Sequence, residues 1–158
     1  MARTDGQAPI PTDAALDALI ETHGASQGAL LPLLHDMMAA FGHVPEHSYD
    51  QIAKALGMTR AEVHGVVSFY HDFRNDPAGQ HVIKLCRAEA CQAQGGADVE
   101  AALLRKIGLD DFGTLSDGSV TVEPVYCLGL CACGPAALVD GAPRGRVTAD
   151  DLASEVGA

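Results

Sequence analysis

The first half of the chain places its apolar residues at helical spacing. The clearest stripe recurs at intervals of three and four residues, which is the period of one helix face, and consists of Val63, Val66, Val67 and Tyr70. Thr59 and Glu62 precede it at the spacing of a capping box, in which each side chain accepts a hydrogen bond from the other residue's backbone amide. The pattern predicts a helix that begins after Thr59 and buries the stripe.

Three earlier segments show the same period. Each begins at a capping residue or a proline and ends at a glycine, which predicts helices from Asp13 to Gly24, from Ser26 to Gly42 and from Pro45 to Gly57. Pro32 lies inside the second segment, and because a proline in a helix interior removes a backbone hydrogen bond, we expect a kink or a later start there. Residues 1–76 are therefore predicted to form a helical bundle.

The pattern changes after the turn-rich residues 75–79, where we place a domain boundary. Short apolar runs of strand type then alternate with helical segments: strands at 81–85, 120–125 and 136–139, a return strand near 146–147 that Pro143 obscures, and helices at 97–107 and 148–156. Residues 77–158 are thus predicted to be an α/β unit with a mixed sheet, so that the whole chain is of the α+β or α/β class.

Composition and charge narrow the function classes. The 158 residues are 47% hydrophobic and 20% charged, which is typical of a globular protein. Lys plus Arg number 10 and Asp plus Glu 21, a net charge of −11, which argues against nucleic acid and anionic membranes as partners. No apolar run reaches the roughly 20 residues of a membrane span, and the acidic start is unlike a signal peptide. We therefore expect a cytoplasmic protein that does not insert into membranes.

The cysteines carry the candidate chemistry. The spacing is Cys86-x4-Cys91, then 35 intervening residues, then Cys127-x3-Cys131, with Cys133 two positions later. Each pair follows a predicted strand, and Gly129 allows the second loop to curl tightly. An odd number of cysteines in a reducing compartment favours metal binding over disulfides. Four thiolates suit a [2Fe–2S] cluster or a single zinc ion, and the absence of a Cys-x2-Cys pair tilts the choice towards iron and sulfur.

Other chemistry has little support in the sequence. There is no Gly-x-Gly-x-x-Gly motif or phosphate loop, and no Ser/His/Asp order or paired carboxylate stands out. His43 and His47 are separated by Pro45 and do not share a helical face. We expect no catalytic site and no nucleotide site on this chain itself. The backbone amides of Arg87 or of residues 128–132 are expected to donate to the cysteine sulfurs.

The segments that carry the cysteines resemble a known family. Glu62 to Tyr70 (EVHGVVSFY), the two cysteine pairs, and Gly134-Pro135 are similar to the thioredoxin-like [2Fe–2S] subunit of the complex I family. The segments Cys86 to Gln92 and Val139 to Val147 are more similar to the gamma subunit of cytosolic, molybdenum-containing NAD-dependent formate dehydrogenases. The family often has alanine where this chain has Gly134, a difference that we expect hardly to affect ligation.

The resemblance implies a fold, a cofactor and partners. It implies a helical N-terminal region joined to a thioredoxin-like ferredoxin domain, with one [2Fe–2S] cluster held by Cys86, Cys91, Cys127 and Cys131, while Cys133 lies outside the ligand pattern. It implies an electron-transfer subunit in direct contact with a partner that carries FMN, the NAD site and a [4Fe–4S] cluster. It also implies a molybdopterin subunit that oxidises formate. The alternatives are the equivalent subunit of a respiratory NADH:quinone oxidoreductase or of a bidirectional NAD-linked hydrogenase, and a zinc-stapled interaction module without redox function.

Overall fold

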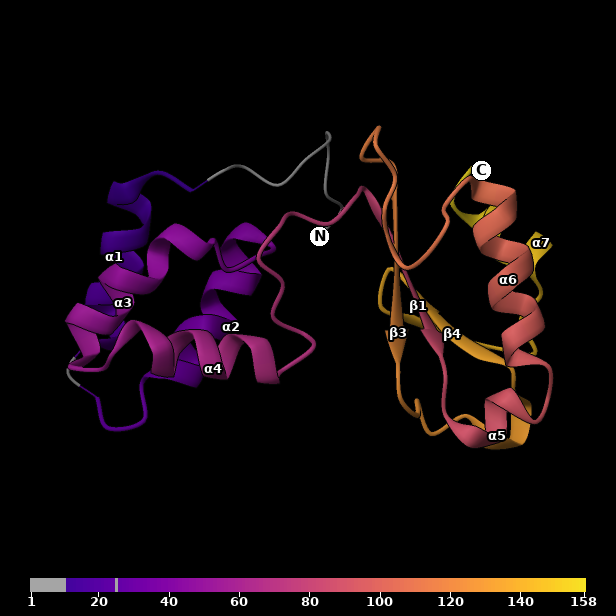
Figure 1. Ribbon diagram of the computed structural model, residues 1–158, viewed down its shortest axis with the longest axis horizontal. Coiled ribbons are helices and arrows are strands. Elements are labelled where there is room, and N and C mark those ends of the chain that lie inside the picture. The colour runs from indigo at the N-terminus through magenta and orange to yellow at the C-terminus, as the bar shows by residue number, and fades with distance from the viewer. Residues whose placement is uncertain (1–10, 25) are drawn as a thin grey trace. The chain divides into compact units, whose positions relative to one another are not determined.

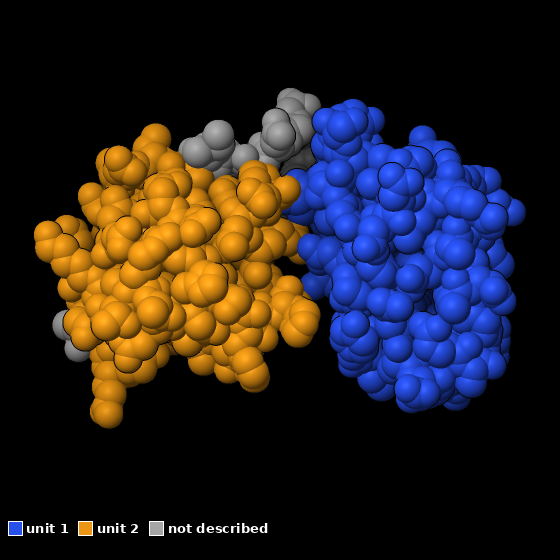
Figure 2. Space-filling view, in the orientation of Figure 1, with its two compact units in different colours: residues 1–7, 78–158 blue, residues 8–77 orange. Residues whose placement is uncertain are grey.

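The computed structural model describes residues 11–24 and 26–158. These residues fall into two compact units (Figure 2): in chain order, the first is formed by residues 11–24 and 26–77, drawn in orange, and the second by residues 78–158, drawn in blue. Each unit has a hydrophobic core of its own. Within the described residues, every helix is too short or too polar to pass through a membrane.

The first unit is a helical bundle (Figure 1), as the apolar spacing predicts. Its helices are α1 Asp13–His23, α2 Leu30–Phe41, the 3-10 turn η1 Glu46–Ser48, α3 Tyr49–Leu56 and α4 Arg60–Phe69. Their apolar faces meet in one core, whose most deeply buried side chains include Leu16, Leu33, Leu34, Met37, Tyr49, Ile52 and Val63. The fold class predicted for this half of the chain is therefore confirmed.

Two predicted helix starts are shifted, and the helix predicted from Pro45 begins as the 3-10 turn η1 before α3 starts at Tyr49. The Thr12 hydroxyl, not Asp13, caps α1 by accepting from the Ala15 amide, and Asp13 is the first helical residue. The second helix begins at Leu30 rather than after Ser26. This later start confirms the expectation for Pro32, because the proline then lies in the first helical turn, where its missing N–H would have no helical partner.

Helix α4 is capped as predicted but buries less than predicted. The Thr59 hydroxyl accepts from the Glu62 amide at 3.2 Å, and the Glu62 carboxylate accepts from the Thr59 amide at 2.8 Å. Val63 and Val67 lie in the core, but Tyr70 is 43% exposed. The expectation that the whole stripe is buried is wrong, because the helix ends at Phe69 and the backbone of Tyr70 is extended.

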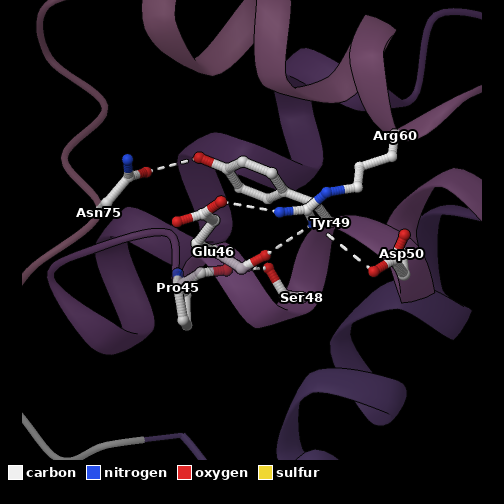
Figure 3. Close-up of polar contacts among 7 residues, drawn as sticks. All are labelled: Pro45, Glu46, Ser48, Tyr49, Asp50, Arg60 and Asn75. Atoms are coloured by element: carbon white, nitrogen blue, oxygen red, sulfur yellow. Dashed lines mark hydrogen bonds and ion pairs between the residues drawn. The ribbon is translucent and has the colours of Figure 1, made fainter.

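A buried tyrosine and a surface arginine connect the helices of this unit (Figure 3). The Tyr49 hydroxyl donates to Asn75 Oδ1 at 2.5 Å. The Arg60 guanidinium lies over the Tyr49 ring, 5.3 Å from its centroid, and donates to Glu46 Oε1 at 2.7 Å. Burial, and then the nearby Glu46 carboxylate, raise the pKa of Tyr49, so its hydroxyl stays protonated and remains a donor. These contacts hold η1, α3 and α4 together.

The second unit contains a mixed five-stranded sheet in the order β2-β3-β1-β4-β5, whose three central strands are labelled in Figure 1. The strands are β1 His81–Cys86, β2 Gly113–Thr114, β3 Val120–Val125, β4 Ala136–Val139 and β5 Ala142–Gly145. β1 and β3 are parallel, and the other pairings are antiparallel, which confirms the predicted mixed sheet. The helices are α5 Glu89–Gln92, α6 Gly96–Ile107 and α7 Ala149–Glu155, and α6 and α7 lie side by side.

The return strand of the hairpin lies earlier than predicted. β5 spans Ala142–Gly145 and includes Pro143, which is aligned with Leu138 of β4. A proline is tolerated here because β5 is the edge of the sheet, so no further strand needs its missing N–H. Arg146 and Val147 follow the strand rather than forming it.

Candidate metal centre

The sheet topology brings the two cysteine pairs to one edge. β1 ends at Cys86, which is aligned with Val125 at the end of its parallel neighbour β3, so the loops that follow both strands leave from the same edge. β4 runs antiparallel to β1 and begins at this edge with Ala136. The candidate site is therefore formed where two strands end and a third begins.

The first loop buries its two thiols. Cys86 is the last residue of β1, and Cys91 lies in the short helix α5; the two residues are 6% and 1% exposed. The loop is held to the next strand by the Arg87 amide, which donates to the Val125 carbonyl at 2.8 Å. This bond corrects the expectation that the Arg87 amide would donate to a sulfur.

The second loop exposes its two thiols. Cys127 adopts a left-handed backbone with φ of 72°, a conformation that is uncommon for residues other than glycine, and Gly129 has φ of 77°. Cys131 then opens a 3-10 turn. Together these turns bring the sulfurs of Cys127 and Cys131 to 3.8 Å from each other. The predicted tight curl at Gly129 is thus present. Glycine suits this position because it adopts the left-handed backbone conformation without strain.

Backbone amides of both loops surround the sulfur of Cys86. Burial alone would raise the pKa of Cys86, but hydrogen bonds from the Ala88 amide, the Cys91 thiol, and the Cys127 and Leu128 amides outweigh it and lower the pKa. Two of these amides belong to the second loop, so a sulfur of the first loop is in direct contact with the backbone of the second. The expectation of sulfur-directed amides in residues 128–132 is confirmed at Leu128.

The remaining thiols show that the pairs interact. Burial, and then the hydrogen bond and charge of Cys86, raise the pKa of Cys91, to which the charge of Cys131 contributes. The hydrogen bond and charge of Cys127, and then burial, raise the pKa of Cys131, with a further contribution from Cys86. Cys91 and Cys131 therefore hold their protons more tightly than a free thiol does, and a bound cation would offset this by favouring the thiolates.

The four thiols lie as two pairs at the border between core and solvent. Apolar residues pack around the buried pair, namely Ala88, Val125, Leu128, Leu130 and Ala136. Over residues 11–24 and 26–158, no three His, Cys, Asp or Glu side chains converge as they would around a single metal ion. The side of the site that carries Cys127 and Cys131 faces solvent.

The fifth cysteine packs against the edge of the sheet. The carbonyl of Cys133 accepts from the Arg146 amide at 2.7 Å. A Cβ atom placed on Gly145 would lie 2.9 Å from both this carbonyl and the Cys133 sulfur, so Cys133 fits closely against the end of β5. Its contacts are those of a packing residue.

Sequence reasoning missed Gln94. Its side chain lies beside the cysteine loops, and its Nε2 donates to the Cys131 carbonyl at 3.0 Å. The contact joins residues 37 positions apart, and no local pattern encodes it. The one hint in the sequence is Gly134. It has no side chain, and the Gln94 amide occupies the space that a side chain there would fill.

Comparison with known proteins identifies the family. Residues 16–156 match the model of the thioredoxin-like [2Fe–2S] ferredoxin. The chain belongs to this family. Its cofactor is accordingly one [2Fe–2S] cluster, and the sulfur-only donor set at the edge of the sheet fits it, because such clusters are bound by four cysteine thiolates. Which thiolates serve as ligands stays a prediction at this point.

Relatives of this ferredoxin are subunits of oxidoreductases. This chain is 34% identical to a subunit of the NADH-quinone oxidoreductase of Escherichia coli (strain K12). The alignment spans 111 residues and covers 70% of this chain and 67% of that protein. The chain is 30% identical to the HndA subunit of the NADP-reducing hydrogenase of Solidesulfovibrio fructosivorans over 140 residues, 89% of this chain and 82% of that protein.

A solved structure shares the fold. The crystal structure of an air-oxidised NAD+-reducing [NiFe]-hydrogenase superposes with a TM-score of 0.66 at 23% identity, over 81% of this chain. The match spans only 22% of that hydrogenase chain. The thioredoxin-like architecture predicted from the sequence is confirmed by the family model that residues 16–156 match.

Proposed function

We propose that Cys86, Cys91, Cys127 and Cys131 are the four cluster ligands, with one pair on each iron. The observation that carries this proposal is the contact between the loops, in which the Cys127 and Leu128 amides donate to the Cys86 sulfur. A bound [2Fe–2S] cluster exchanges one electron at a time and requires no proton chemistry of the protein.

The protein's own groups adjust how strongly an electron is held. Amides that donate to the sulfurs stabilise added negative charge and so favour reduction. The net charge of −11 acts in the opposite direction. Burial of Cys86 and Cys91 keeps solvent from one half of the site, whereas Cys127 and Cys131 are exposed and give a redox partner a short path to the other half.

We propose that the chain is the electron-transfer subunit of a cytoplasmic, NAD-dependent, molybdenum-containing formate dehydrogenase complex. Its direct partner would be a flavin and NAD-binding iron–sulfur subunit that carries FMN and a [4Fe–4S] cluster, and a molybdopterin subunit would oxidise formate. The chain itself would have no catalytic site. The similarity of the segment from Cys86 to Gln92 to formate dehydrogenase gamma subunits supports this assignment.

A second candidate is the equivalent subunit of an NADH:quinone oxidoreductase or of an NAD-linked hydrogenase. The relatives named above, which are subunits of an NADH-quinone oxidoreductase and of an NADP-reducing hydrogenase, favour it. Purification from the native host together with the accompanying subunits separates the two candidates. Molybdenum in the complex and formate-dependent reduction of NAD would support the first. A complex that contains flavin and iron but neither molybdenum nor formate activity would support the second.

Single Cys→Ser variants test the ligand set. We expect Cys86→Ser, Cys91→Ser, Cys127→Ser and Cys131→Ser each to lose most of the visible absorption and to lose or alter the paramagnetic signal of the reduced protein. Cys133→Ser is the matched control and should keep both. An unchanged spectrum in any of the four would contradict that ligand, and a colourless wild-type protein with about one zinc per chain would contradict the cluster itself.

A further inference from the structure

The side-chain amide of Gln94 joins the two cysteine loops. Its Nε2 atom donates to the Ala90 carbonyl at 2.7 Å and to the Cys131 carbonyl at 3.0 Å. An amide nitrogen carries two hydrogens, so one can be given to each carbonyl. Because both partners are acceptors, only the nitrogen end of the side chain fits between them.

The two carbonyls belong to opposite halves of the candidate site. Ala90 immediately precedes Cys91 on α5, and Cys131 is itself a proposed ligand on the second loop. A single side chain thus fixes the backbone beside one ligand relative to the backbone of another.

Gly134 provides the space for this bridge. A Cβ atom at position 134 would lie 2.8 Å from Gln94 Nε2 and 3.2 Å from its Cδ. The backbone of Gly134, with φ of −69° and ψ of 163°, is open to any residue, and this extended region is also the one favoured before a proline. Glycine at this position therefore matters for space and not for conformation, because an added methyl group would meet the end of the Gln94 side chain.

We infer that Gln94 is a positioning residue that holds the Cys131 loop against the Cys91 loop, and that Gly134 admits it. The inference rests on the proposed ligand set. Without the bridge, the exposed second loop opens more readily and the bound metal leaves faster. A lost neutral hydrogen bond of about 1 kcal/mol corresponds to about a fivefold faster release.

The test compares metal release from Gln94→Ala and from the control Gln92→Ala. Gln92 is the last residue of the same short helix. The folded proteins are mixed with an excess of an iron chelator, and the decay of the visible absorption is followed. Gln94→Ala should release iron about fivefold faster and shift the paramagnetic spectrum of the reduced protein, while the circular dichroism spectrum of its metal-free form stays that of the wild type. Gln92→Ala should match the wild type in all three.

A second variant tests the role of Gly134 separately. Gly134→Ala should also speed release, because the added methyl displaces the Gln94 amide, and it should add little in the Gln94→Ala background. Wild-type rates and an unshifted spectrum in Gln94→Ala would overturn the inference, and fully additive effects would overturn the role of Gly134. Failure of the proposed ligand set would be seen in other variants instead, as Cys91→Ser or Cys131→Ser protein that keeps the wild-type spectrum.

Discussion

At the residue scale, two helical glycines show that the space around a glycine decides whether replacing it with alanine stabilises or destabilises the protein. At Gly96, the first residue of α6, a Cβ atom would lie 2.8 Å from the carbonyl oxygen of Cys91. At Gly65, inside α4, nothing lies within 4 Å of the same position. One glycine thus permits close approach to a candidate ligand, and the other only weakens its helix.

We expect alanine at these two positions to change stability in opposite directions. Gly96→Ala should lower the free energy of unfolding by about 1–3 kcal/mol, because the backbone of Cys91 cannot move away without strain. Gly65→Ala should raise it by about 1 kcal/mol through helix propensity. Urea unfolding of both variants measures this. A stabilised Gly96→Ala protein would show that α5 can shift freely against α6.

The cysteine ligand candidates could be predicted from the sequence because their spacing is local. Cys127-x3-Cys131 places two sulfurs on one turn, and Gly129 marks the curl. The Gln94 contact could not be predicted in this way, because it depends on how two loops meet after the sheet has formed. The amide donors to Cys86 could be predicted only in part for the same reason.

Helix α4 is the element with the strongest local specification. Removing one half of its capping box by Thr59→Ala should lower the free energy of unfolding by about 1 kcal/mol, because the Glu62 amide loses its acceptor at the helix start. Ser68→Ala, on the exposed surface of the same helix, is the control and should change stability by less than about 0.5 kcal/mol. Thermal or urea unfolding of the two variants and the wild type measures these changes. Equal effects of the two variants would contradict a specific role for the cap.

The other half of the box predicts a dependence on pH. Hydrogen bonds from the Thr59 backbone amide and then from its side chain lower the pKa of Glu62 below 4.5, its ordinary value. A carboxyl with a lowered folded-state pKa stabilises the protein above its unfolded-state pKa, and this contribution is lost as the pH falls through the folded-state value. The stability difference between wild type and Glu62→Gln should therefore shrink on acidification. A difference that stays constant from neutral to acid pH would contradict the charged cap.

Element boundaries were harder to predict than the elements themselves. Glycine stops at Gly42 and Gly57 are local, and both residues take the left-handed conformation that ends a helix. The start of α2 is not local in this sense, since Ser26 offers a cap that the chain does not use. Pro143 obscured β5 because only the order of strands in the sheet shows that it lies at an edge.

At the scale of the whole molecule, the chain has two separate hydrophobic cores, and each stabilises its own unit. One is formed by α1 to α4, and the other by the sheet with α6 and α7. All four candidate ligands lie in the second unit. We propose that each unit is a domain that unfolds by itself, so that damage to the helical core leaves the metal centre in place.

Matched core truncations test this division. Leu33 and Leu103 are both fully buried, one in each core. Leu→Ala at either site should lower the stability of its own unit by about 2–5 kcal/mol, because a cavity remains. Heating is followed by helical circular dichroism and by visible absorption together. Leu103→Ala should lower the temperature at which the visible absorption is lost, whereas Leu33→Ala should lower only a separate helical transition. If Leu33→Ala lowered both to the same extent, the two units would be one cooperative domain.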